Sequence, residues 1–362
     1  MKSNGKKICI VVTSLGKGGA ERSSALLSKL LSGLGYTIHI VMIVDEINNE
    51  FQGELLNLGK IDSRFPILKK IKKLKAFKSY LKIHHFDFVI DNRSRPSLLR
   101  EFIVSRWLYD PRKTIYCIHS YRLNTYFSTV KCIAKYMYKD AYKLVAVSEE
   151  IKKAIASVYD LTNVITIYNP VGDLQSQAIT DEQLVSDYIL FYGRINDEVK
   201  NLSLLIESYH KSELPEHNIS LIILGDGKDL EAIKLKVRAK NLNKDVIFKS
   251  FIDNPYSYVK RAKFTVLTSR YEGFPMTILE SLALGTPVVS VDCKSGPSEM
   301  IRDGYNGLLV ENNNSEKMAL AMNRFIEDNP LYLKCKSNTK PSVAKFSMEH
   351  IGQAWEQLLT KN

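Results

Sequence analysis

Short runs of apolar residues recur along the chain, and segments whose apolar residues follow helical spacing separate them. Such runs are expected to form the buried strands of parallel sheets. We expect strands at 8–12, 38–44, 86–90, 114–118, 143–147, 165–171, 188–192, 221–224, 246–248, 264–268 and 288–291. Because strands alternate with helices, the pattern predicts an α/β fold built from Rossmann-like units.

The length favours two domains, since 362 residues exceed the roughly 150 that one domain usually holds. A polar stretch at 172–187 is expected to be the hinge between them. No run approaches the roughly 18 apolar residues of a membrane helix, and no apolar signal region follows Met1. The five scattered cysteines form no metal-binding spacing and are typical of a reducing cytosol.

Charge is distributed unevenly along the chain. Residues 1–180 hold 28 basic and 15 acidic side chains, whereas residues 181–362 hold 23 and 24. A membrane surface or a phosphorylated acceptor fits this excess, and no nucleic-acid-binding motif accompanies it. Arg93 and Arg95, after a predicted strand, would either grip an acceptor phosphate or be ordinary loop arginines.

Much of the excess lies in a predicted helix at 67–82 that contains no acidic residue. Its apolar stripe is expected to pack on the sheet. Its lysines would then face an anionic surface, or else only water. They are Lys69, Lys70, Lys72, Lys73, Lys75, Lys78 and Lys82.

The glycine-rich segment from Leu15 to Glu21 lies between the first strand and a helix. A dinucleotide-binding fingerprint would need glycine where Glu21 stands. Asp45, however, ends the second strand as a ribose-binding acid would. A nicotinamide-dependent dehydrogenase therefore remains an alternative at this point.

Two glutamates bracket a loop and a helix in the second half. Glu272 follows the strand at 264–268, and Glu280 lies inside a predicted helix at 276–284 that ends at Gly285. The carboxyl edge of a parallel sheet is where ligands bind, and free N–H groups at a helix start attract anions. Because carboxylate oxygens accept hydrogen bonds from hydroxyl groups, the pair suits a sugar with a phosphate.

The run from Ser269 to Pro287, with these two glutamates eight positions apart, resembles the signature of glycosyltransferase family 4, the retaining GT-B enzymes. Further matches are Gly18-Gly19-Ala20-Glu21, Gly193-Arg194 with Lys200-Asn201, Leu221 to Gly227, and Ser295-Gly296-Pro297-Ser298-Glu299. The resemblance covers nearly the whole chain and is strongest from 193 to 310. Ser250 departs from it, because relatives usually have glycine there.

The resemblance implies a GT-B fold, in which two Rossmann-like domains face each other across a cleft. Residues 1–171 would bind the acceptor and residues 172–346 the nucleotide-sugar. A final helix within 347–362 would cross back to the first domain.

The resemblance also implies roles for individual residues. Arg194 and Lys200 would hold the donor diphosphate and stabilise its charge as it leaves. Glu272 and His119 would lie at the donor sugar, and Glu280 would bind the ribose. The other expected donor contacts are Gly18, Gly19, Gly273, Phe274, Pro275, Met276, Thr277, Phe251 and Ile252. No metal or cofactor is implied, and no Asp-x-Asp motif with metal-ligand partners stands out.

The expected activity is retaining transfer of a hexose or N-acetylhexosamine from a nucleotide-sugar. The variant Ser-Gly-Pro at 295–297, where many relatives have Gly-Gly, resembles enzymes that build bacterial surface glycans from UDP-sugars. The acceptor would be a polyprenyl-diphosphate-linked or other membrane-associated glycan, and the protein would lie at the cytoplasmic face of the membrane. The alternatives are a GT-B sugar-nucleotide epimerase and a basic Rossmann protein that binds membranes or nucleic acid.

Overall fold

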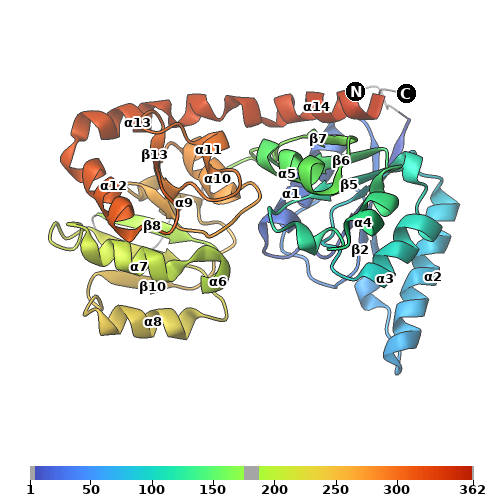
Figure 1. Cartoon of the computed structure of the whole chain (residues 1–362), viewed down its shortest axis with the longest axis horizontal. Helices are drawn as coiled ribbons and strands as arrows, with labels where there is room; N and C mark the ends of the chain where they lie inside the picture. Colours follow the sequence, from blue (N-terminus) through green and yellow to red (C-terminus); the bar gives the residue numbers. More distant parts are fainter. Residues whose placement is uncertain (1–4, 175–186, 361–362) are drawn as a thin grey trace. The chain divides into compact units, whose positions relative to one another are not determined.

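The computed structural model describes residues 5–174 and 187–360. The chain forms two compact units: unit 1 combines Met1–Pro170 with Met348–Asn362, and unit 2 is Val171–Ser347 (Figure 1). Most of the predicted hinge, residues 175–186, lies outside the described residues. Each unit alternates strands with helices, which confirms the predicted α/β class.

Unit 1 contains a parallel sheet in the order β3-β2-β1-β4-β5-β6-β7. Its strands are β1 (Lys7–Val12), β2 (Thr37–Met42), β3 (Glu54–Asn57), β4 (Phe88–Asp91), β5 (Thr114–Ile118), β6 (Lys143–Ala146) and β7 (Val164–Thr166). Every residue of β4 and β5 is buried, as expected for strands covered on both faces. The β3 strand was not predicted, because its Glu-Leu-Leu-Asn sequence is half-exposed at the sheet edge.

The helices of unit 1 include the last helix of the chain. They are α1 (Gly19–Gly33), α2 (Pro66–His84), α3 (Leu98–Ile103), α4 (Lys131–Tyr138), α5 (Glu149–Tyr159) and α14 (Met348–Thr360), with the shorter η1 (Leu58–Lys60), η2 (Val104–Leu108), η3 (Pro111–Lys113) and η4 (Leu123–Thr125). Trp355 and Leu359 of α14 are buried in one cluster with Leu27 and Leu31 of α1. Unit 1 is therefore completed by residues from the far end of the sequence.

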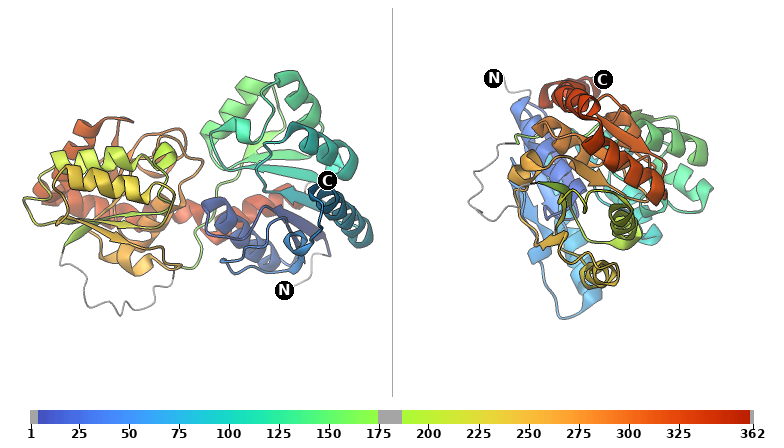
Figure 2. Two further views of the ribbon diagram at one scale, coloured as in Figure 1. Left: turned by 90° about the horizontal axis from the view of Figure 1, so that it is seen from below. Right: turned by 90° about the vertical axis from the view of Figure 1, so that its left-hand side faces the viewer.

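Unit 2 repeats the arrangement with the strand order β10-β9-β8-β11-β12-β13. The strands are β8 (Tyr188–Tyr192), β9 (Ser220–Leu224), β10 (Val246–Lys249), β11 (Thr265–Leu267), β12 (Val288–Val291) and β13 (Gly307–Val310). The helices are α6 (Asp197–Lys200), α7 (Leu202–Lys211), α8 (Leu230–Ala239), α9 (Tyr256–Arg261), α10 (Met276–Leu284), α11 (Pro297–Met300), α12 (Ser315–Glu327) and α13 (Asn329–Ser342), with η5 (Ala344–Phe346). Helices cover both faces of each sheet (Figure 2).

The prediction that the apolar stripe of α2 packs on the sheet is wrong. Phe77 is buried, but Ile67, Ile71 and Leu74 are 72%, 43% and 38% exposed. The 19 residues of α2 extend about 28 Å, whereas the six residues of the neighbouring β2 extend about 20 Å. The first turns of α2 therefore reach beyond the sheet that would bury them (Figure 1).

The possibility that Arg93 and Arg95 grip an acceptor phosphate is also contradicted, because both side chains are buried. Arg93 Nη2 donates to Asp91 Oδ2 at 2.6 Å and to Glu101 Oε2 at 3.0 Å. The Arg95 guanidinium lies over the Tyr116 ring, 5.1 Å from its centroid. Burial alone would raise the pKa of Asp91, but the charges of Arg93 and Arg95 lower it below its usual value. These arginines hold the loop after β4 in place.

Replacement of Arg93 by Met should remove the cation that Asp91 and Glu101 share, and lower the free energy of unfolding by about 3 kcal/mol, the low end of the range for a broken buried pair. The loss stays at the low end because Arg95 still faces Asp91 and Arg100 still pairs with Glu101. Urea unfolding followed by tryptophan fluorescence reports this change, because both tryptophans lie in unit 1. The control is Arg112→Met, whose exposed pair with Asp110 contributes at most about 1 kcal/mol. Equal effects of the two substitutions would contradict a buried ionic network.

Candidate functional site

Strand order reverses once in each sheet, between β1 and β4 in unit 1 and between β8 and β11 in unit 2. At such a point the loops at the carboxyl ends of the two strands diverge and leave room for a ligand. Gly193 and Arg194 follow β8, and Glu272 follows β11. The structure thus brings these three predicted residues to the switch point of unit 2.

The loop after β8 is held by close contact between two stretches of backbone. A Cβ atom on Gly225 would lie 1.9 Å from the Gly193 oxygen, and one on Gly227 would lie 2.0 Å from the Ile195 oxygen. The Ile195 N–H donates to the Asp226 oxygen at 2.8 Å. Only glycine permits this approach. The contact fixes the loop that carries Arg194, whose side chain is exposed.

Lys200 and Glu272 form an ion pair, although 72 positions separate them in the sequence. Lys200 Nζ lies 2.7 Å from Glu272 Oε1, and Ser269 Oγ donates to the same oxygen at 2.6 Å. Lys200 ends α6, and its backbone oxygen accepts a hydrogen bond from Thr268 Oγ1 at 3.0 Å. Both charged side chains remain partly exposed. The supporting role of Ser269 and Thr268 was not predicted.

A second loop supports the one that contains Glu272. The Glu272 N–H donates to the Lys294 oxygen at 2.8 Å, and Ser295 Oγ donates to the Gly273 oxygen at 2.8 Å. Gly296 has φ 102°, and a Cβ atom there would lie 2.8 Å from Pro275 Cδ. The Ser-Gly-Pro residues at 295–297 therefore pack against and support the Gly-Phe-Pro segment at 273–275.

The α10 helix starts directly after this segment. Pro275 precedes it with φ −67° and ψ 105°, and Gly285 ends it with φ 93°. The Thr277 oxygen accepts a hydrogen bond from Tyr192 Oη at 2.7 Å, which ties the start of α10 to the end of β8. Glu280 is buried slightly more than one turn into the helix. The free N–H groups at the start of α10 add positive potential to the switch point.

Apart from His119, the remaining predicted residues lie at three other places. Phe274 is buried against the ring of Phe346 at 5.2 Å, so its side chain packs inside unit 2. Phe251 and Ile252 follow β10 and are half-buried, and the Phe251 N–H donates to Asp226 Oδ2 at 3.0 Å. In unit 1, Gly18 and Gly19 form the start of α1 after β1.

His119 has both ring nitrogens buried and without a hydrogen-bond partner among the described residues. It lines a small cavity of unit 1 with Asn92, Asn169 and Ser23 of α1. Burial, and secondarily the charge of Arg95, lowers the pKa of His119 to about 4, so the imidazole is neutral at pH 7. The Asn92 Oδ1 atom is likewise unpaired within the described part of the chain. Unpaired buried polar atoms of this kind indicate a site for water or a polar ligand.

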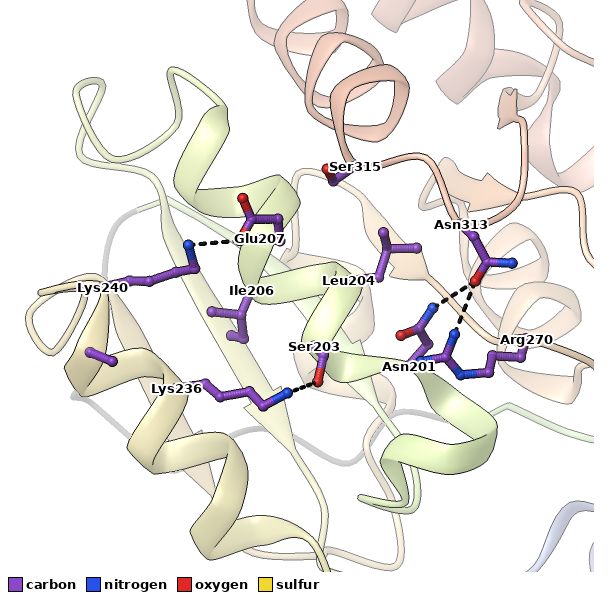
Figure 3. A pocket seen from close by; sticks show the side chains of 11 residues that line it. Asn201, Ser203, Leu204, Ile206, Glu207, Lys236, Lys240, Arg270, Asn313 and Ser315 are labelled. Atoms are coloured by element: carbon purple, nitrogen blue, oxygen red, sulfur yellow. Dashed lines mark hydrogen bonds and ion pairs between the residues drawn. The ribbon is translucent and has the colours of Figure 1, made fainter.

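A larger groove of unit 2 lies beside α7 and α8 (Figure 3) and contains none of the predicted donor contacts. Its charged side chains already have partners within the protein. Lys240 Nζ lies 2.6 Å from Glu207 Oε2, and Arg270 Nη1 donates to Asn313 Oδ1 at 3.1 Å. We therefore do not place the functional site there.

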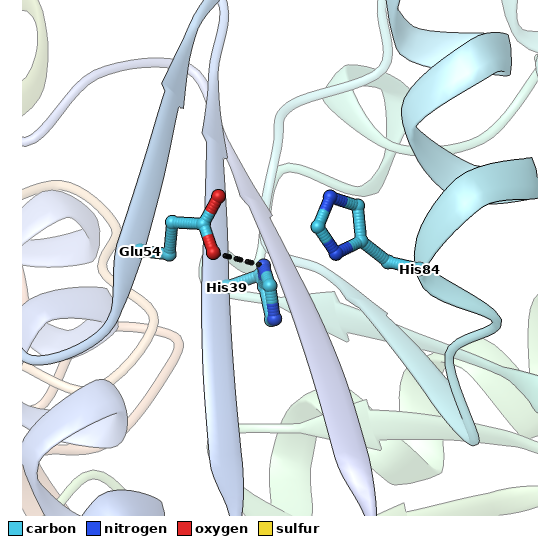
Figure 4. Close-up of side chains that lie close together, drawn as sticks. All are labelled: His39, Glu54 and His84. Carbon is cyan, nitrogen blue, oxygen red and sulfur yellow. Dashed lines mark ion pairs between the residues drawn. The ribbon is translucent and has the colours of Figure 1, made fainter.

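Three potential metal ligands meet at the edge of unit 1, where His39, Glu54 and His84 bring donor atoms within 4.8 Å of one another (Figure 4). The His39 Nδ1 atom that faces Glu54 at 3.5 Å also lies 2.7 Å from Tyr80 Oη. The rings of His84 and Tyr80 are in contact, 4.2 Å apart. We assign the cluster to the attachment of α2 to β2 and β3.

No helix in the described part of the chain has the length and apolar character needed to span a bilayer.

Comparison with known proteins identifies the relatives. Residues 176–341 match the family model described as "Glycosyl transferases group 1". The N-acetylgalactosamine-N,N'-diacetylbacillosaminyl-diphospho-undecaprenol 4-alpha-N-acetylgalactosaminyltransferase of Campylobacter jejuni is 29% identical to this chain, over 96% of this chain and 98% of that protein. The amylovoran biosynthesis glycosyltransferase AmsD of Erwinia amylovora is 23% identical, over 98% and 99%.

Solved structures share the fold. HepE of Anabaena, in complex with UDP and glucose, has a TM-score of 0.80 at 19% identity and covers 98% of this chain and 99% of its own. TarM of S. aureus has a TM-score of 0.78 at 18% identity, with 99% of each chain covered. Likeness to these structures confirms the predicted GT-B fold class.

The buried ring nitrogens of His119 should make stability depend on pH. Its pKa is about 4 in the folded protein against about 6.5 when exposed, so the unfolded chain binds more protons between these values. Stability therefore falls as pH is lowered from 6.5 toward 4, by at most about 1.4 kcal/mol per pH unit for one proton. His119→Asn should flatten this slope in urea unfolding measured across the window. His217→Asn, at an exposed site, is the control, and an identical slope in both variants would refute the assignment.

Proposed function

We propose that this chain, whose residues 176–341 match the model described as "Glycosyl transferases group 1", is a glycosyltransferase that transfers a hexose or N-acetylhexosamine with retention from a UDP-sugar. The proposed acceptor is a lipid-linked or membrane-associated glycan in bacterial surface polysaccharide synthesis. The observation that carries the proposal is the Lys200–Glu272 pair at the switch point of unit 2, with the exposed Arg194 in the loop after β8 at the same edge of the sheet.

The donor diphosphate is assigned to Arg194, Lys200 and the start of α10. Two cations and free N–H groups converge on one edge of the sheet there. Preorganised donors of this kind stabilise the negative charge that develops when a phosphate leaves. Lys200 is already positioned by Glu272 and by the Thr268 hydrogen bond, so it needs little reorganisation.

The sugars are assigned to the two glutamates. Glu280 would accept hydrogen bonds from the ribose hydroxyls, and Glu272 would touch the transferred sugar. In the reaction the acceptor oxygen bonds to the anomeric carbon while the bond from that carbon to the diphosphate breaks. The acceptor's proton passes to the leaving diphosphate, so no side chain is required as a base. The neutral His119 would contribute a hydrogen bond to the donor sugar.

The relatives support the choice of substrates. HepE was solved with UDP-glucose as well as with UDP and glucose. The named substrate of the Campylobacter enzyme carries diphospho-undecaprenol, and a Staphylococcus aureus relative, 29% identical over 62% of this chain, is named for poly(ribitol-phosphate). Both acceptors contain phosphate, which suits the positive charge of residues 1–180.

A sugar-nucleotide epimerase on the same fold is the main competing activity. The two are separated by incubating the protein with UDP-sugars, with and without a polyprenyl-diphosphate-linked glycan, and analysing the products by liquid chromatography and mass spectrometry, because an epimer has the mass of its parent and differs only in retention time. A transferase forms UDP together with an acceptor heavier by one sugar, and only when acceptor is present. An isomerised UDP-sugar formed without acceptor would overturn the proposal.

Replacement of Glu280 by Ala should weaken UDP binding about 10²-fold or more. Two hydrogen bonds from ribose hydroxyls to a carboxylate contribute roughly 1.5–3 kcal/mol each. Isothermal titration calorimetry measures the change in affinity, and thermal unfolding shows whether the variant, which is altered at a buried position, still folds. Glu280→Gln, which keeps the volume and loses the charge, should fall between wild type and Ala. Unchanged affinity in a folded Ala variant would remove Glu280 from the site.

Arg194→Ala and Lys200→Ala should each lower kcat about 10²–10³-fold, the typical loss for one preorganised charge donor. Lys228→Ala serves as the control, because Lys228 belongs to an exposed pair with Glu198 at the surface of the same unit. EDTA should leave wild-type activity unchanged. Reversible loss of activity in EDTA would contradict transfer without a metal.

A further inference from the structure

The first turns of α2 expose a group of large apolar side chains. Ile67, Leu68, Ile71 and Leu74 are all exposed, and Phe65, just before the helix, is 59% exposed. Positions 67, 71 and 74 follow helical spacing, so they share one face. Single exposed apolar residues are ordinary, but a cluster of this kind marks an interaction site.

Lysines surround this apolar group, and no acidic residue occurs between Pro66 and His84. Two lysines of α2 are turned toward the body of unit 1: Lys69 pairs with Asp62 at 2.9 Å, and Lys73 Nζ donates to the Ile43 oxygen at 2.9 Å. The others are exposed and are Lys70, Lys72, Lys75, Lys78 and Lys82.

A tryptophan extends the same surface. Trp107 of η2 is 73% exposed and lines a hollow together with Lys78, Lys82 and Lys113. Tryptophan prefers the boundary between water and lipid, where its ring is apolar and its N–H remains wet. We call this surface, made of residues 65–78 and Trp107, the α2 face.

We propose that the α2 face inserts into an anionic lipid bilayer, with its apolar side chains and Trp107 among the acyl chains and its lysines at the phosphates. Long lysine side chains reach from an apolar setting to a polar one, and basic amphipathic helices lie in membrane interfaces in this manner. A second copy of the chain would fit poorly, because a two-fold contact would bring the two sets of lysines together. This proposal goes beyond the proposed reaction and can be tested independently of it, because lipid binding is measured without donor or acceptor.

The test uses the full chain with vesicles of phosphatidylglycerol and phosphatidylcholine. We expect co-sedimentation at 0.1 M salt, where exposed charges are screened over about 10 Å. A fraction should remain bound at 0.5 M salt, where a protein held by charge alone would be released. Lipids brominated in the acyl chains should quench the exposed Trp107 and spare the buried Trp355. Trp107→Phe should therefore lose the quenching.

Two sets of substitutions separate the contributions. Ile67→Ser with Ile71→Ser and Leu74→Ser should lower partitioning at 0.5 M salt about tenfold or more. Lys70, Lys72, Lys75 and Lys78 changed together to Glu should abolish binding at 0.1 M salt. The matched control changes exposed leucines of unit 2 to Ser and should bind like wild type; they are Leu235, Leu320 and Leu333.

Three results would overturn the proposal. One is complete release at 0.5 M salt without quenching of Trp107, which leaves only electrostatic adsorption. Another is equal binding by the triple Ser variant and its control. The last is a dimer in solution that the triple Ser variant dissociates, because the α2 face would then belong to a second copy.

Discussion

Parallel pairing of the strands is the constraint on which the rest of the structure depends. When all strands of a sheet run the same way, every loop after a strand emerges at one edge. Residues as distant in sequence as Lys200 and Glu272 then become neighbours, and 2.7 Å separates their charged atoms. The same constraint places His119 and the start of α1 at one edge of unit 1. The positions of the candidate sites in both units are therefore set by the strand topology.

The sequence predicted the strands well where burial on both faces makes them continuously apolar, as in β5 and β8. It did not predict β3, or β13, whose four residues start with glycine. The glutamates after β11 were recognised from a local run of residues. Their partners Ser269 and Thr268 were not, because hydrogen bonding depends on side-chain directions that spacing does not define.

Charge was the hardest property to predict from the sequence. Arg93 and the lysines of α2 are all basic residues of unit 1, yet Arg93 is buried with Asp91 and Glu101, whereas most of the lysines meet water. The periodicity of α2 correctly predicted a helix. It could not show that the helix is longer than the strands beside it, and this difference in length leaves Ile67 and Ile71 uncovered.

The Lys200–Glu272 pair has a consequence for selectivity. Each charge is already neutralised by the other, so a small anion that approaches Lys200 must compete with a carboxylate 2.7 Å away. Inorganic phosphate gains little from that exchange. A ligand that also offers hydroxyl groups to Glu272 compensates the carboxylate for its lost partner. If the pair binds the donor as proposed, we expect it to discriminate against bare anions and in favour of molecules that join a phosphate to a sugar at the right separation.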